Sequence, residues 1–326
     1  MRKSKKESEQ SATAVVESAA VEPTAAQTAA VDNPPEKVPT YEEYQELRHR
    51  IRLDVRTRET FQHSRVITDN RLGFKADGKT KQNLSQSNLR MSTGTEHLKA
   101  IADLCRNAED DLEEHLLGLL KKEPVYRVFL VNIRGIGPIT AGHIISEFDI
   151  FKADTVSKMW QYSGNNPGMV PGKKSVPKGK YKKSMGVKIA EEVTKTGNIR
   201  YIVQTDIPIR GDKLTEGFVS PFNQNLRIAL NGVMADVFIK SRSPYRKLYD
   251  DKKNQLEHSD KLIYHDGKMI PWKDASDGHR HNAAKRYMVK MFLADLYNAW
   301  RPCYGLSVRP SYQEEKLGHK HNIAAM

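Results

Sequence analysis

The side chains best able to do chemistry in this sequence are lysines gathered in one short stretch. From Pro171 to Lys188 the chain carries seven lysines and no acidic residue. They are Lys173, Lys174, Lys178, Lys180, Lys182, Lys183 and Lys188. Ammonium groups neutralise phosphates without reading base sequence, and the interspersed Gly and Pro disfavour a helix. The stretch predicts a mobile loop that contacts a nucleic-acid backbone; the alternative is a solvated loop without a ligand.

A second candidate is the stretch 128–147, in which two apolar segments flank Gly135-Ile-Gly-Pro138. The glycines permit a tight turn, and Pro138 suits the first turn of a helix. The pattern is typical of a helix-hairpin-helix, whose free backbone N–H groups favour a phosphate. An ordinary helical packing element with a glycine turn is the alternative. The expected nucleic-acid contacts are Arg134, Gly135, Gly137 and Thr140.

Composition favours a polyanionic partner and a reducing compartment. The 326 residues include 53 Lys and Arg against 40 Asp and Glu, giving a net charge of +13. Cys105 and Cys303 form no CxxC pair, and His279 and His281 have no second ligand pair at metal spacing. We therefore expect no metal site and no evident cofactor. With no apolar run of about 20 residues and no signal-peptide pattern, we expect a cytoplasmic, nucleoid-associated prokaryotic protein without a membrane partner.

The elements that must position these residues are predicted to be mainly α-helical. Residues 1–40 are expected to be a disordered tail, because they hold almost no large apolar side chains. The arginine-rich stretch 41–66 and the apolar stripe of 97–122 both show helical periodicity. Within 41–122 we expect an antiparallel helical hairpin, the alternative being a coiled coil between chains. The arginines could lie along a nucleic acid or form a solvated face. Assembly into a dimer or higher homo-oligomer is also expected.

The stretch 123–310 is predicted to be a second, helical domain that contains the helix-hairpin-helix and a small irregular or β insertion at 189–222. Two short β-like runs, 201–203 and 207–209, indicate a hairpin within that insertion. A helix follows Phe222, and a last core helix spans 282–301. The buried face of the first of these helices is expected to hold Leu226, Leu230, Val233, Met234, Val237 and Phe238. Residues 311–326 are expected to be a flexible tail.

Three segments, taken together, resemble a known family. After a long helix come Asn132–Ala141, Tyr162-Ser-Gly-Asn-Asn-Pro167 and Asn223–Leu230. In this order they resemble the Ile-Pro-Gly-Ile-Gly-x-x-Thr-Ala, aromatic-Ala-Gly-Leu-x-Pro and Gly-Asn-x-x-Leu-Arg-x-x-Leu motifs of insertion sequence 110/116/902 transposases. The resemblance covers roughly residues 97–310. Residues 195–200 compete for the last motif, but the long helix after Leu226-Arg227 favours the later match.

This resemblance implies DNA transposition or recombination, with a structured guide RNA as a further partner. The family pairs a metal-binding RuvC-like domain with a C-terminal domain that supplies a serine nucleophile from a Ser-Gly pair. No RuvC-like pattern fits before residue 97, so Mg²⁺ is expected only if such a domain is supplied elsewhere. Ser175 stands nearest the expected position, ahead of Ser184 and Ser220, although no Ser-Gly pair is present. Its lysine neighbours could lower its pKa or hold the scissile phosphate.

The sequence therefore predicts a DNA-binding, transposase-related protein whose own strand-transfer activity is left open. An active serine transposase is one alternative. The other is a structural DNA- or RNA-binding protein that takes no part in strand transfer. The last motif adds Asn225 and Arg227 to the expected DNA contacts.

Overall fold

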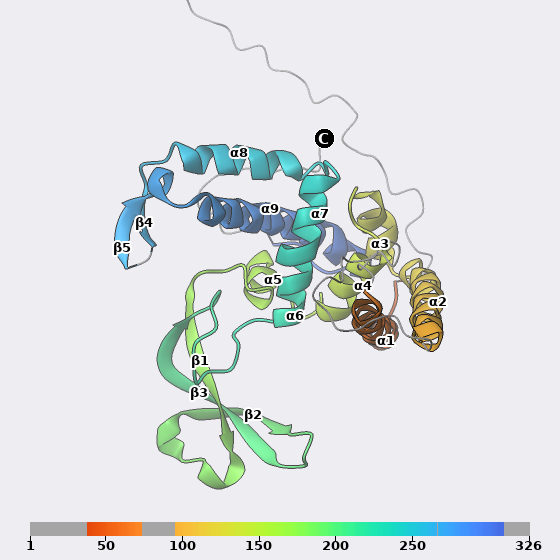
Figure 1. Cartoon of the computed structure of the whole chain (residues 1–326). Coiled ribbons are helices and arrows are strands. Elements are labelled where there is room, and N and C mark those ends of the chain that lie inside the picture. The colour runs from red at the N-terminus through yellow and green to blue at the C-terminus, as the bar shows by residue number, and fades with distance from the viewer. Residues whose placement is uncertain (1–37, 74–94, 266, 310–326) are drawn as a thin grey trace, which may run out of the picture.

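The computed structural model describes residues 38–73, 95–265 and 267–309. The tails expected at 1–40 and 311–326 lie outside the described residues, apart from residues 38–40. Within the described ranges the chain is mainly α-helical with a small antiparallel sheet inserted, as predicted. Figure 1 shows a helical body with the sheet projecting from one side of it.

The first two helices form the predicted antiparallel hairpin. Helix α1 (Tyr41–Leu72) begins at a capping box between Thr40 and Glu43, and α2 (Thr95–Leu120) runs back along it. Two ion pairs of 2.6 Å join them, Arg65 to Glu109 and Arg106 to Asp69. From one pair to the other the α1 residue rises from 65 to 69 while the α2 residue falls from 109 to 106, as antiparallel helices require.

The buried face of α2 differs from the predicted stripe. Ile101 and Leu104 were expected in this stripe but are 37% and 66% exposed. Cys105 is buried as predicted, and Ala102 and Glu109 are buried with it. Glu109 is buried because Arg65 and Arg58 of α1 reach its carboxylate. Ion pairing across the hairpin therefore helps to set which face of α2 turns inward.

Short helices connect this hairpin to the rest of the body. They are α3 (Pro124–Val128), a 3₁₀ turn at Leu130–Asn132, α4 (Pro138–Glu147) and α5 (Val156–Tyr162). Pro124 and Pro138 both stand in the first helical turn, where a missing N–H costs nothing. The turn between Asn132 and Pro138 holds the predicted glycines.

The core is built around the last helix, α9 (Asp277–Trp300), which begins five residues before the predicted 282–301. Its N-cap is Ser276, whose side chain accepts from His279 N. Helix α8 (Arg246–Glu257) and the run from Gln224 to Lys240 pack against it, as do the shorter helices α3 and α5. That run comprises α6 (Gln224–Arg227), a π-helical segment (Ile228–Met234) and α7 (Ala235–Lys240).

The π-helical segment overturns part of the predicted buried face. Val233 and Val237 were expected inside, but they are 54% and 36% exposed, while Ala229 and Ala235 are buried. A π-helix holds more residues per turn than an α-helix, so side chains beyond it rotate around the axis. A buried face predicted from 3.6 residues per turn therefore names the wrong residues after this segment.

The sheet is larger and begins earlier than the insertion predicted at 189–222. Strands β1 (Met169–Pro177), β2 (Val187–Val193) and β3 (Ile199–Arg210) pair antiparallel in the order β1-β3-β2. The runs 201–203 and 207–209 belong to the single strand β3 and not to a hairpin. Strand β2 pairs only with residues 199–204 of β3, so the side of β3 that faces β2 is unpaired at Pro208. A proline is tolerated at such an unpaired position.

A second, smaller hairpin joins α8 to α9. It consists of β4 (Leu262–His265) and β5 (Lys268–Pro271), and lies at the end of the helical body in Figure 1. Among the described residues, no helix combines the length and apolarity that a bilayer crossing requires.

Candidate nucleic-acid interface

The three-stranded sheet carries an unusual excess of positive charge. Residues 169–210, here called the lysine arm, hold ten Lys and Arg against three Asp and Glu. This surplus of seven charges is more than half of the +13 of the whole chain. Lys173 and Lys174 lie on β1, and Lys178, Lys180, Lys182 and Lys183 lie in the β1–β2 connection. The stretch predicted to be a mobile loop is thus partly strand and partly 3₁₀ turns.

Most of these lysines have no acidic partner within the described parts of the chain. Lys188 pairs with Glu191 at 2.9 Å, and the Lys174 ammonium lies 4.8 Å from the centre of the Phe218 ring. The remaining five have no ion pair with a described residue, and all five are exposed. Because their charges are not neutralised internally, the arm presents a positive potential to solvent.

Local contacts hold the arm in place at its root. The Thr205 hydroxyl donates to the Gly172 carbonyl at 3.0 Å, and Val219 N donates to the Lys173 carbonyl at 2.7 Å. A Cβ on Gly172 would meet the Phe218 ring at 2.5 Å, so only glycine lets this ring approach the strand. The arm is therefore anchored to the segment that follows β3.

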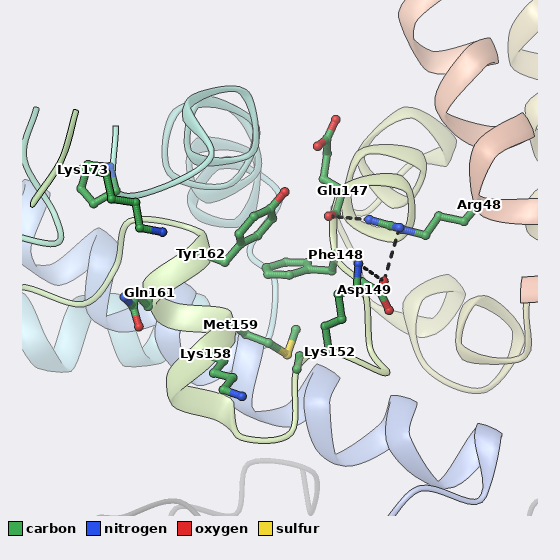
Figure 2. Close-up of a pocket in the computed structure, with 12 residues that line it drawn as sticks. Arg48, Glu147, Phe148, Asp149, Lys152, Lys158, Met159, Gln161, Tyr162 and Lys173 are labelled. Atoms are coloured by element: carbon green, nitrogen blue, oxygen red, sulfur yellow. Dashed lines mark hydrogen bonds and ion pairs between the residues drawn. The ribbon is translucent and has the colours of Figure 1, made fainter. Parts of the chain in front are cut away.

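A cavity of about 500 Å³ lies where the arm meets the helical body. Figure 2 shows side chains from α1, the α4–α5 region and β1 around it, with Tyr162 and Phe148 at its centre. Its cationic lining residues are Arg48, Lys152, Lys158 and Lys173. Three of them have carboxylate neighbours: Arg48 and Lys152 lie near Asp149, and Lys158 pairs with Asp154. Lys173, contributed by the arm, has none among the described residues.

Glu147 joins this cavity to α1 and α6. Its carboxylate accepts from Arg56 Nη2 and from Asn223 Nδ2, both at 2.7 Å, and Asn223 Nδ2 also lies 3.1 Å from the Tyr162 hydroxyl. Burial alone would raise the pKa of Glu147, but hydrogen bonds from Arg56 and Asn223 and the nearby arginine charges hold it below its ordinary value. Glu147 is thus a fixed anion that orients its neighbours.

The arginine face of α1 neither extends along a free surface nor stands wholly in solvent. Arg48 and Arg52 donate to the carbonyls of Glu147 and Ser146, and Arg56 bonds the Glu147 side chain. These carbonyls belong to the last turn of α4, where no intrahelical donor remains. Arginines spaced by four residues therefore cap a neighbouring helix, which neither interpretation of the sequence anticipated.

The glycines of the predicted helix-hairpin-helix have different roles. Gly135 has φ = 100°, and a Cβ there would lie 2.9 Å from Ser241 Oγ and 3.2 Å from the Phe238 ring, so it packs against α7 and its C-terminal end. Gly137 is the exposed N-cap of α4; a Cβ added to it would have no neighbour within 4 Å, and no side chain caps the helix there. Of the other two expected contacts, Arg134 is exposed and Thr140 is half-buried. Only the Gly137 side of the turn is open to a ligand.

The hairpin turn and the root of the lysine arm lie at opposite ends of α4. The turn stands at the N-terminal end of α4, whereas the cavity that includes Lys173 adjoins Glu147 at its C-terminal end. Ten helical residues separate the two ends by about 15 Å. A ligand contacting both would have to follow α4.

Two of the segments quoted for the family resemblance meet in space. Asn223 N donates to the Tyr162 carbonyl at 2.8 Å. Gly164, with φ = 70°, lets Phe222 and Arg227 approach, since a Cβ would meet them at 2.9 and 3.1 Å. Arg227 Nη1 donates to the Asp212 carbonyl, while Asn225 is exposed. The sequence pointed to Lys173 and Arg227 and gave Asn223 as the start of a motif, but it held no signal for Glu147, Lys152 or Lys158.

Ser175, the candidate nucleophile, lies on β1 opposite Ile202. Arg200 Nε donates to its hydroxyl at 2.8 Å, and Arg200 Nη2 donates to its carbonyl at 2.8 Å. Within the described residues, no histidine or carboxylate contacts this hydroxyl. The serine therefore has a cation that could stabilise negative charge, but no partner placed to take its proton.

No group of three or more His, Cys, Asp and Glu arranged to hold a metal occurs in ranges 38–73, 95–265 and 267–309. His281 is hydrogen-bonded to Tyr249 at 2.7 Å, and His279 stacks on Trp272. Comparisons with protein families, curated proteins and solved structures found no match for this chain.

Proposed function

We propose that this protein binds DNA through the sugar-phosphate backbone and acts in transposition or recombination. The lysine arm is the main contact, and the cavity at its root continues the contact surface toward α1. The observation that carries the proposal is the set of exposed arm lysines that have no acidic partner among the described residues. Lysines that bind phosphate must be free to neutralise it, and a group of them on one arm can contact successive phosphates.

The recombination role rests on the resemblance to insertion sequence 110/116/902 transposases. Support comes from Asn223, whose backbone and side chain both contact Tyr162, and from Gly164 packed beneath Arg227. The motif residues thus belong to one connected unit beside the arm. A structured RNA remains compatible with the same surface, because backbone contacts do not distinguish its phosphates from those of DNA.

We propose that this chain binds and positions the DNA, while a separate nuclease cleaves the strands. Ser175 has Arg200 as its partner but no contacting base among the residues that the structure describes, which favours binding over nucleophilic attack. A RuvC-like partner, if present, would bring its own Mg²⁺. The rival function is a structural DNA- or RNA-binding protein outside recombination.

Salt dependence of DNA binding tests the electrostatic contact. We expect Lys173→Ala, Lys174→Ala, Lys178→Ala and Lys180→Ala together to flatten the slope of log K against log salt by about three to four, at about 0.9 per lost phosphate contact. Fluorescence anisotropy with a labelled duplex between 50 and 200 mM salt measures this slope.

A matched control removes four exposed lysines from the helical body. They are Lys99, Lys121, Lys122 and Lys247. If both quadruple variants change the slope equally, net charge and not the arm drives binding, and the proposed interface is wrong. Branched DNA tested beside plain duplex separates the two functions, since a recombination protein is expected to prefer the branched form.

A further inference from the structure

An arginine cluster lies where β3 returns to the helical body. Asp212, which is buried, follows the strand and binds Arg210 through both carboxylate oxygens, with Nε and Nη2 at 2.9 and 2.8 Å. This fork-to-fork geometry makes a strong charge-assisted pair. Because Arg210 already matches the single charge of Asp212, each further arginine at this place adds net positive charge.

Arg227 is the second member of the cluster. Its Nη1 donates to the Asp212 carbonyl at 2.5 Å, and its guanidinium lies 4.6 Å from the centre of the Phe222 ring. Neither contact neutralises its charge, and it forms no ion pair with a described residue. Packing against Gly164 and Phe222 instead holds its side chain in one orientation.

Arg286 of α9 is the third member, and it has no hydrogen bond or ion pair to any residue that the structure describes. Burial lowers the pKa of Arg286, and the nearby positive charges of Arg227 and Arg210 lower it further. The carboxylate of Asp212 acts in the opposite direction. Arg286 is half-buried, and the positive charges of Arg227 and Arg210 near it disfavour its own charge unless an anion binds there. The three arginines thus leave two positive charges uncompensated at one place.

Space for a ligand adjoins this cluster. A cavity of about 460 Å³ is lined by Arg227, Asp212 and Lys213, with Gln224 as a further polar side chain. Phe222, Leu214 and Ile228 form its apolar lining, and the latter two are 61% and 64% exposed. Lys213 adds another cation to the lining of this cavity. The carboxylate that lines it belongs to Asp212, which is already paired with Arg210.

We propose that Arg210, Arg227 and Arg286, with the adjoining cavity, form a phosphate-binding site separate from the lysine arm. Planar guanidinium groups suit phosphate oxygens, and apolar walls beside them would accept a sugar or base. The phosphate comes either from the nucleic acid of the proposed function or from a free phosphorylated small molecule. The nucleic-acid source rests on that proposed function, whereas the small-molecule source does not.

Two readouts on the full chain test the site. The first is the melting temperature in inorganic phosphate compared with chloride at equal ionic strength, where we expect phosphate to raise it by about 2 °C or more. The second is affinity for a labelled DNA duplex. Arg286→Gln is expected to abolish the phosphate response and, for a nucleic-acid source, to weaken DNA binding about tenfold. Arg286→Lys should restore part of each effect, since it keeps the charge.

Arg71→Gln serves as the control, because it removes one exposed arginine at the end of α1. Loss of DNA affinity in Arg286→Gln alone identifies a nucleic-acid phosphate, and loss of only the phosphate response identifies a small molecule. If Arg286→Gln and Arg71→Gln behave alike in both readouts, the site does not exist. A wild-type chain that binds no DNA would refute the proposed function, while the melting experiment would still test the arginines.

Discussion

Because of Glu123, the free energy of unfolding of this protein should fall as the pH rises from 4.5 to about 7. Glu123 lies between α2 and α3 with no exposed surface, and its carboxylate accepts from Trp300 Nε1 at 3.2 Å and from the Tyr304 hydroxyl at 2.8 Å. Burial raises its pKa from 4.5 to about 7, outweighing the lowering effect of these hydrogen bonds. The folded protein therefore keeps the proton to a higher pH than the unfolded chain does.

The sign follows from where the proton is held. Below pH 4.5 the carboxyl of Glu123 is protonated in both states and has no effect on the pH dependence of stability. Between pH 4.5 and about 7 the unfolded chain loses the proton first, so the free energy of unfolding falls. Above about pH 7 both states are ionised, and the loss reaches about 3 kcal/mol, at 1.36 kcal/mol per tenfold difference in proton affinity.

Glu123→Gln tests this directly, because the amide keeps the shape and can still bond Trp300 and Tyr304. Urea unfolding should show the variant more stable than wild type by about 3 kcal/mol at pH 8, and by less than about 1 kcal/mol at pH 5. Glu147→Gln is the matched control: its lowered pKa predicts the opposite sign, with stability lost at pH 8. If the difference in free energy of unfolding between Glu123→Gln and wild type is the same at pH 5 and pH 8, the reasoning is refuted.

Two further predictions concern the hairpin turn and Ser175. Gly135→Ala should destabilise the fold by about 2 kcal/mol, because its φ is positive and Ser241 blocks a Cβ, whereas Gly137→Ala should leave thermal unfolding nearly unchanged. If the two melt alike, the packing role of Gly135 is wrong. Incubation with branched DNA followed by a denaturing gel should show no covalent adduct; an adduct that Ser175→Ala removes would make the chain an active serine transposase.

The parts of the fold that sequence reasoning found are those encoded locally. Periodic apolar residues located α1, α2 and α9. Helical periodicity failed at residues 228–234, because a π-helix does not follow a repeat of 3.6. Strand β3 was split in two because the polar residues Gln204, Thr205 and Asp206 separate its two apolar runs, although the strand continues through them.

The candidate site depends on contacts between distant parts of the chain, which composition does not encode. The lysines were visible as a charge run, but their distance from the hairpin turn depends on which end of α4 the arm meets. Arg48 and Arg52 looked like surface charges because their partners are backbone carbonyls nearly a hundred residues away. Arg286 gave no signal, since its neighbours come from β3 and α6.

The arginine contacts between α1 and α4 also make the helical hairpin a mechanical lever. Helix α1 is fixed to α4 at Arg48, Arg52, Arg56 and, through His143, at Glu59, and it continues thirteen residues further to Leu72. That length is about 20 Å, so a tilt of about 5° at the last fixed point would move its far end by about 2 Å. Because Arg48 also lines the cavity at the root of the lysine arm, the contacts that hold the hairpin begin at that cavity.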